Sequence, residues 1–321
     1  MIHRQNWLDV RGFLRYCRRD LQLTDASIAS ADGHLRHLLR WADAAPLPTA
    51  RAVDPVFPAY LVGLGLAPST LVKALGTVRK FFEFARLDYA PRYRLITPSW
   101  LHLLKPPRSH NLDSRLPVRA YYSLEEVRAL LAVSPETLRV RRIQAAIALL
   151  FLSGMRDGAF VTLPIACLDL PERTLYQLPE RGVHTKNAVA AITYLLDIPD
   201  LLDVVTRWDH FLRGSFPVDA PWYPALSRTG EELVAPAFPA RERASCLRDD
   251  LELLCESANL PYKSPHKLRH GHIVYARERA QNMGQYKAVS QNVMHASLQT
   301  TDTLYAALKR DQIKNVIAGL K

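Results

Sequence analysis

Apolar residues recur at helical spacing along the first part of the chain. Residues 8–17 and 35–39 each place their apolar side chains on one helical face, and residues 55–64 offer another short helix. A turn with a candidate N-cap at residues 65–70 then leads into a longer amphipathic helix over residues 71–85. The pattern predicts a small helical bundle, residues 1–90, whose apolar faces pack together.

A second helical pattern begins near residue 120. Ser123 is a candidate N-cap with Glu126 three residues later, and this arrangement predicts a capping box at the start of a helix. Residues 143–152 are almost wholly apolar, so we expect a helix at the centre of the second domain.

Two short strands interrupt these helices. Residues 170–178 and 188–196 have strand character, and the turn-like residues 179–182 lie between them, with Lys186 at the start of the second strand. After them the chain returns to helical patterns. The second domain, residues 119–321, is therefore expected to be mainly α with a small antiparallel β-sheet.

Residues 91–118 differ from both flanking regions. They contain five prolines and five basic residues and lack a sustained period. We expect an extended, basic linker between the two domains.

Charge points to a polyanionic partner. The 321-residue chain is 48% hydrophobic, carries a formal net charge of +11 and has a pI near 9.6. Residues 1–118 hold 17 basic and 9 acidic residues, a net charge of +8, and the other two thirds of the chain hold the remaining +3. Nucleic acid is the leading candidate partner, and the N-terminal third is expected to grip it electrostatically.

The four cysteines are widely separated and form no C-x-x-C pair, so neither a disulfide framework nor a zinc knuckle is indicated. We expect buried free thiols at Cys17, Cys167, Cys246 and Cys255. The first residues do not form a signal peptide and no apolar run reaches about 18 residues, so a cytoplasmic, soluble, nucleoid-associated protein is expected.

Five residues in a fixed order carry the most specific chemical signal. Arg156 follows the central apolar helix, His266 and Arg269 lie three residues apart, and His295 precedes Tyr305 by ten residues. A phenol, two guanidiniums and two imidazoles can attack, hold and neutralise a phosphodiester without a metal ion. In this order the residues resemble the tyrosine recombinase (phage integrase) family.

The resemblance implies a role for each residue. Tyr305 would be the nucleophile, and Arg156 and Arg269 would stabilise charge on the nonbridging phosphate oxygens. His266 and His295 would position the phosphate and assist proton movement. The product would be a 3′-phosphotyrosyl enzyme, formed without ATP, a metal ion or another cofactor.

A lysine and a further histidine complete the implied site. Lys186 matches the hairpin lysine that protonates the leaving 5′ oxygen in the family, and His270 matches a residue with a structural role there. On this helix His266 and Arg269 share a face, while Leu268 can pack into the core.

The family also implies an architecture and partners. The N-terminal domain would be a core-binding, SAM-like domain with Lys73, Arg79 and Lys80 as candidate DNA contacts. The partners would be double-stranded recombination sites, other copies in a synaptic tetramer, and accessory or co-recombinase proteins. Integration, excision or resolution of DNA, for example in a mobile genetic element, would all use these residues, as would much of a type IB topoisomerase site. A C-terminal segment over residues 308–320 would dock on a neighbouring subunit or fold back on its own domain.

Two departures from the family pattern keep other readings open. Ala159 stands where a glutamate is usual, which leaves Asp157 as the possible carboxylate, and Met294 stands where glycine is usual. A DNA-binding protein with impaired catalysis is therefore an alternative, and a metal-dependent nuclease is another. Arg156 could also form an internal salt bridge with Asp157 or another acid.

A zinc site is the alternative for the histidine cluster. His266, His270 and His272 are close in sequence, and histidines at i and i+4 can bind zinc. Position 267 is lysine rather than the glutamate of an H-E-x-x-H helix and no further ligand set follows, so no metal site is expected.

Overall fold

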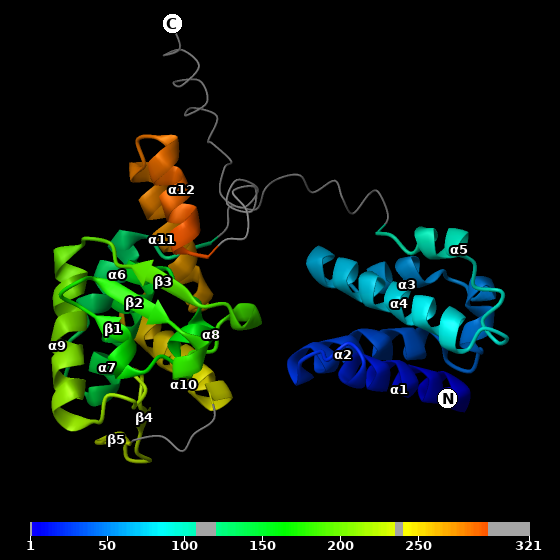
Figure 1. Cartoon of the computed structure of the whole chain (residues 1–321), viewed down its shortest axis with the longest axis horizontal. Helices are drawn as coiled ribbons and strands as arrows, with labels where there is room; N and C mark the ends of the chain where they lie inside the picture. Colours follow the sequence, from blue (N-terminus) through cyan, green and yellow to red (C-terminus); the bar gives the residue numbers. More distant parts are fainter. Residues whose placement is uncertain (1, 107–119, 235–239, 295–321) are drawn as a thin grey trace, which may run out of the picture. The chain divides into compact units, whose positions relative to one another are not determined.

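The computed structural model describes residues 2–106, 120–234 and 240–294. The chain divides into two compact units, Met1–Leu116 and Pro117–Lys321 (Figure 1). Each unit has its own apolar core and is described separately below.

Unit 1 is a bundle of helices, as the apolar pattern predicts. Its elements are α1 (Arg4–Arg19), α2 (Asp25–Ala42), a 3₁₀ turn (Leu47–Ala52), α3 (Phe57–Gly63), α4 (Pro68–Asp88) and α5 (Pro98–Leu103). The helix α4 begins at Pro68 with Ala67 as N-cap, rather than after a hydroxyl N-cap at 69–70. Proline is suited to the first helical position because its missing N–H would be unpaired there anyway.

The first half of the expected linker belongs to this bundle. Tyr93, Ile96, Leu101 and Leu104 are all buried in the core of unit 1, and the Tyr93 hydroxyl donates a hydrogen bond of 2.7 Å to Asp9. The expectation of an extended linker is therefore wrong for residues 91–104. Prolines and arginines dominate the composition there, but the apolar side chains between them are what the core buries. Residues 107–119 lie outside the described residues.

Unit 2 is mainly helical with a small antiparallel sheet, as expected. Its helices are α6 (Leu124–Leu131), α7 (Leu138–Ser153), α8 (Asp157–Phe160), α9 (Pro199–Ser215), α10 (Ala240–Ser257), α11 (His266–Arg279) and α12 (Met283–Asn292). The capping box is confirmed: the Ser123 side chain accepts from the Glu126 N–H and the Glu126 carboxylate accepts from the Ser123 N–H.

The sheet has three strands, β1 (Leu168–Asp169), β2 (Thr174–Gln177) and β3 (Ala191–Tyr194), in that spatial order. The two expected strands are present as β2 and β3, shortened at both ends. Lys186 lies in a 3₁₀ turn before β3 rather than at the start of the strand. A two-residue pairing of β4 (Ala225–Leu226) with β5 (Leu233–Val234) was not expected, because such short segments carry no period.

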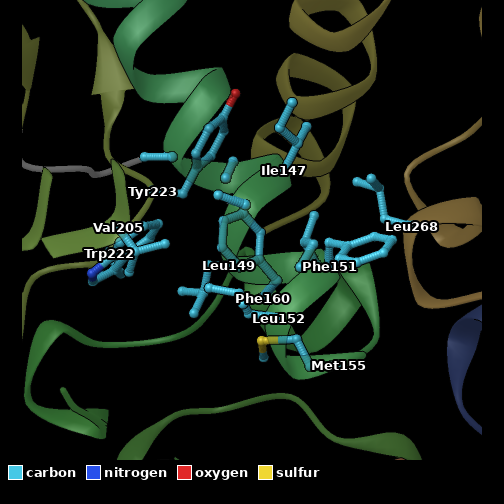
Figure 2. Close-up of a cluster of buried hydrophobic side chains, with 14 of the residues drawn as sticks. Ile147, Leu149, Phe151, Leu152, Met155, Phe160, Val205, Trp222, Tyr223 and Leu268 are labelled. Carbon is cyan, nitrogen blue, oxygen red and sulfur yellow. The ribbon is translucent and has the colours of Figure 1, made fainter. Parts of the chain in front are cut away.

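The helix α7 forms the centre of unit 2. Every residue from Arg142 to Ser153 is buried, and Leu268, Trp222 and Tyr223 pack around it (Figure 2). Gly154 ends the helix in the left-handed conformation, with φ +61°. The buried run continues through Met155, and Arg156 follows it directly.

The helix α11 packs closely against α7 and the segment before α6. A Cβ at Gly271 would lie 2.0 Å from the Tyr122 carbonyl oxygen and 3.0 Å from Phe151. The His272 ring is fully buried, with its Nδ1 2.8 Å from the Phe151 carbonyl oxygen. This close approach fixes where α11 begins relative to the end of α7.

The four cysteines are free thiols. Cys17, Cys167 and Cys255 are buried as expected, but Cys246 is exposed on α10, because it occupies a polar face of an amphipathic helix. None of the described helices is long and apolar enough to cross a membrane.

We predict that Gly271→Ala destabilises the protein by about 1–3 kcal/mol, because the added methyl group overlaps a backbone carbonyl that cannot move independently. Urea unfolding measures the change. Gly214→Ala in α9 is the matched control: an added Cβ there meets no atom within 4 Å, so stability should be unchanged or slightly raised. Equal stability of the Gly271→Ala variant and the wild type would contradict the close packing.

A second prediction concerns pH. Burial lowers the pKa of His272 to about 4, so its ring is neutral in the folded state, whereas the unfolded chain takes up a proton near pH 6.5. The unfolded state binds more protons between these values, so this residue lowers the free energy of unfolding by about 3 kcal/mol as pH falls from about 6.5 to 4. His272→Gln should flatten that slope in denaturant unfolding measured across the same pH range. An unchanged slope would assign the pH dependence to other groups.

Candidate active site

Arg156 lies at the junction between α7 and α8. It is the N-cap residue of α8, and its carbonyl oxygen accepts hydrogen bonds from the N–H groups of Ala159 and Phe160. Its half-buried guanidinium forms no hydrogen bond or ion pair within the described part of the chain, and burial lowers its pKa. The expected alternative of a salt bridge with Asp157 is therefore not found. A partly desolvated, unpaired guanidinium is suited to receive an anion.

His266 is the first residue of α11 and lies close to this guanidinium. Its Nδ1 is 4.0 Å from a carboxylate oxygen of Asp157. Burial lowers the pKa of His266, Asp157 acts in the opposite direction, and the positive charges of Arg269 and Arg156 lower it further. The ring is therefore held towards its neutral form at neutral pH, in which it can accept as well as donate a proton.

Arg269 lies one turn further along α11 and is 3% exposed. Its Nη1 donates a hydrogen bond of 2.7 Å to the carbonyl oxygen of Gly154, and its Nη2 donates to the carbonyl oxygen of Val293. Gly154 and Val293 are the C-cap residues of α7 and α12. One guanidinium thus satisfies a carbonyl at the C-terminal ends of two helices, where the helix dipoles also favour a positive charge.

The segment that leads to His295 and Tyr305 begins at Val293, whose carbonyl oxygen accepts the hydrogen bond from Arg269. Val293 is buried, and Met294 adopts a left-handed conformation with φ +55°. Met294 therefore makes the turn that glycine makes more readily, at a cost of roughly 1–2 kcal/mol. His295 and Tyr305 lie outside the described residues.

Lys186 is exposed in the turn between β2 and β3. It forms no hydrogen bond or ion pair with Arg156, His266 or Arg269 among the described residues. The turn is nevertheless anchored near Arg156, because the His184 N–H donates a hydrogen bond of 2.8 Å to the Thr162 hydroxyl, which itself donates to the Ala159 carbonyl oxygen.

The structure therefore gathers three of the six predicted catalytic residues: Arg156, His266 and Arg269. The departure at Ala159 is a buried methyl group beside Arg156, and Asp157 provides the nearest carboxylate to His266. Thr162 was not anticipated from the sequence, because a threonine after a short helix has no distinctive signal by itself.

Asn292, the last residue of α12, was also not anticipated. Its side-chain amide forms two hydrogen bonds with the backbone of Tyr194 in β3. An asparagine at a predicted helix end is a signal for a local turn, but its long-range partner is visible only in the tertiary structure.

The histidine cluster does not form a metal site in the described residues. The rings of His266 and His270 pack edge to face, 4.8 Å between centroids, and the Nδ1 of His272 is taken by the Phe151 carbonyl oxygen. No group of three or more His, Cys, Asp or Glu side chains within the described ranges could hold a metal ion.

The three candidate DNA contacts on α4 do not share one face. Lys73 and Lys80 are exposed and lie near His34 of α2 and Cys17 of α1, respectively, since each lysine affects the pKa of that neighbour. Arg79 is half-buried, and its Nη2 donates a hydrogen bond of 2.7 Å to the carbonyl oxygen of Leu104 at the end of α5. Residues seven apart lie on the same side of a helix, whereas consecutive residues diverge.

Comparison with known proteins supports the resemblance seen in the sequence. No family model matches the chain. The tyrosine recombinase XerD of Brucella abortus biovar 1 (strain 9-941) is 27% identical over 261 residues, covering 79% of this chain and 76% of the relative. The tyrosine recombinase XerD of Rhizobium meliloti (strain 1021) is 24% identical over 320 residues, covering 96% and 84%.

Solved structures show the same fold. The Tn1549 transposon integrase in complex with circular intermediate DNA matches with a TM-score of 0.66 at 14% identity, covering 98% of this chain and 99% of the integrase. A lambda integrase dimer bound to a COC′ core site matches with a TM-score of 0.61 at 13% identity, covering 91% and 95%. The expected resemblance is confirmed: this chain is similar in sequence to tyrosine recombinases and has their fold.

Proposed function

We propose that this protein is a site-specific DNA recombinase that cuts and rejoins DNA strands through a 3′-phosphotyrosyl intermediate at Tyr305. The observation that carries the proposal is the half-buried guanidinium of Arg156, which has no partner among the described residues and lies beside His266 and Arg269, in a chain similar to tyrosine recombinases. No carboxylate among the described residues pairs with Arg156. An anion that enters this position therefore meets a positive charge that is not already neutralised.

Each step of the proposed reaction has a candidate group. The Tyr305 hydroxyl attacks the scissile phosphorus, its proton passes to a neighbouring base, and the bond to the 5′ oxygen breaks. Arg156 and Arg269 stabilise charge on the nonbridging oxygens, while His266 and His295 orient the phosphate and assist proton transfer. Lys186 gives the departing 5′ oxygen its proton. Attack by a 5′ hydroxyl on the phosphotyrosine reverses the step.

The proposed substrate is double-stranded DNA that carries recombination sites. The solved structures that this chain resembles are complexes with DNA, and one of them is a lambda integrase dimer. We extend this to a synaptic tetramer of this chain on DNA in the nucleoid, with residues 308–320 as the segment that contacts a neighbouring copy and with accessory or co-recombinase proteins as further partners. Integration, excision and resolution are all compatible with this chemistry.

We predict that Tyr305→Phe abolishes formation of a covalent adduct and leaves DNA binding intact, because only the attacking oxygen is lost. The assay uses nicked suicide substrates that carry candidate sites from the flanks of the encoding locus, in EDTA, with SDS-resistant adduct as the readout. An adduct from Tyr305→Phe would place the nucleophile elsewhere. Specific binding without an adduct from either protein would instead favour a DNA-binding protein with impaired catalysis, and cleavage abolished by EDTA would indicate a metal-dependent nuclease.

A second prediction concerns the candidate DNA contacts on α4 of unit 1. If Lys73 and Lys80 each contact a phosphate, Lys73→Gln with Lys80→Gln should weaken binding and reduce the slope of log K against log salt by roughly 1.8. Arg79→Gln should leave that slope unchanged and lower the stability of unit 1, because its guanidinium bonds to Leu104. Fluorescence anisotropy with a labelled duplex across salt concentrations measures the first effect, and urea unfolding measures the second. A reduced slope for Arg79→Gln alone would restore it as a DNA contact.

A further inference from the structure

The strand β3 is an edge strand whose outer side is covered by a side chain. The sheet order is β1-β2-β3, so within the described part of the chain β3 pairs with a strand, β2, on one side only. On the other side the Tyr194 N–H donates a hydrogen bond of 2.7 Å to Oδ1 of Asn292, and Nδ2 of Asn292 donates one of 3.0 Å to the Tyr194 carbonyl oxygen. The planar amide of Asn292 therefore bonds to β3 as the backbone of another strand would.

A second set of hydrogen bonds, made by buried side chains, also joins Asn292 to β3. The buried Thr193 hydroxyl donates to the backbone carbonyl oxygen of Asn292 at 3.2 Å and accepts a hydrogen bond of 2.7 Å from the buried Gln177 side chain. Both the side chain and the main chain of Asn292 are thus bonded to β3, and α12 lies beside β3 (Figure 1).

The hairpin that carries Lys186 is anchored on both of its sides. On the β2 side of Lys186, the His184 N–H bonds to Thr162, next to the helix that begins after Arg156. On the β3 side, Tyr194 bonds to Asn292, whose neighbour Val293 accepts from Arg269. Between these anchors, Asn187 and Ala188 adopt left-handed conformations with φ +61° and +51°, which non-glycine residues rarely adopt. A turn of this shape persists only where the surrounding structure fixes it.

We propose that Asn292 is a positioning residue that fixes the Lys186 hairpin relative to the helix end that continues to His295, so that Lys186 can protonate the leaving 5′ oxygen. This inference rests on the proposed function above. Asparagine is suited to the task because its planar amide carries a donor group, the NH₂, beside an acceptor group, the carbonyl oxygen. Aspartate would place an oxygen against the Tyr194 carbonyl, and leucine would fill similar volume without either bond.

The test compares two leaving groups. Suicide substrates are made with the ordinary phosphodiester or with sulfur in place of the 5′ bridging oxygen at the scissile position. A thiol has a pKa of about 8.5, so the thiolate departs without a proton donor, whereas an alkoxide needs one. The variants are Asn292→Leu, Asn292→Asp and Lys186→Ala, with Gln291→Leu as the matched control at an exposed position of the same helix end.

We expect Lys186→Ala to cleave the phosphodiester roughly 100-fold slower or worse, and Asn292→Leu and Asn292→Asp roughly 10- to 100-fold slower. All three should cleave the sulfur substrate at close to the wild-type rate, and Gln291→Leu should match the wild type on both. A loss of the same size on both substrates, or no loss on either, would overturn the positioning role of Asn292. A wild-type protein that gives no adduct would overturn the proposed function instead.

Hydrogen exchange provides a readout that does not depend on catalysis. In full-length protein, Asn292→Leu should accelerate exchange of the Tyr194 amide and of the amides in the turn 184–190, while the amides of α7 stay protected. Unchanged protection of Tyr194 and the turn would show that Asn292 does not fix the hairpin. Faster exchange throughout unit 2 would reduce Asn292 to a general stabilising residue and would also overturn the inference.

Discussion

The arrangement of the candidate site depends on the buried guanidinium of Arg269. A buried cation is tolerated only when its N–H groups find acceptors, and here two acceptors are carbonyl oxygens at the C-terminal ends of α7 and α12. Those carbonyl oxygens have no partner within their own helices. The hydrogen bonds from Arg269 therefore satisfy both the buried guanidinium and the two helix ends. The residues that follow each helix end, Arg156 after α7 and Met294 after α12, are thereby held near the first turn of α11.

The two arginines of the site have opposite surroundings. Arg269 donates hydrogen bonds to the protein backbone, whereas Arg156 is half-buried and has no partner among the described residues. Burial is the main cause that lowers the pKa of His266; Asp157 opposes it, and the positive charges of Arg269, Lys267 and Arg156 lower this pKa further. A site built in this way favours an anion over a cation, and the anion would gain the interaction that Arg156 lacks within the protein.

Polar side chains bond to the backbone on the outer side of β3 and in the turn that precedes it. The Thr162 hydroxyl accepts a hydrogen bond from the His184 N–H, and the side-chain amide of Asn292 pairs with the Tyr194 backbone. These side chains fix the turn around Lys186. Met294 stands where glycine is usual in the family, and it keeps the left-handed turn that glycine makes, at some cost in strain. The hydrogen bond from Arg269 to the Val293 carbonyl oxygen stabilises that turn from the preceding residue.

The sequence by itself determined most of the helices and the two main strands, because apolar periodicity and local capping depend on neighbours in the chain, and it named the candidate site residues. The capping box at Ser123 and the buried run of α7 were predicted for this reason. The extended linker was predicted wrongly for residues 91–104, since only packing in unit 1 shows that Tyr93 and Leu104 are core residues. Tertiary structure alone decided that Arg269 bonds to Gly154 and Val293, that Arg79 turns to α5, and that Asn292 covers β3. These contacts join residues far apart in sequence, and their geometry depends on how whole helices pack rather than on any local pattern.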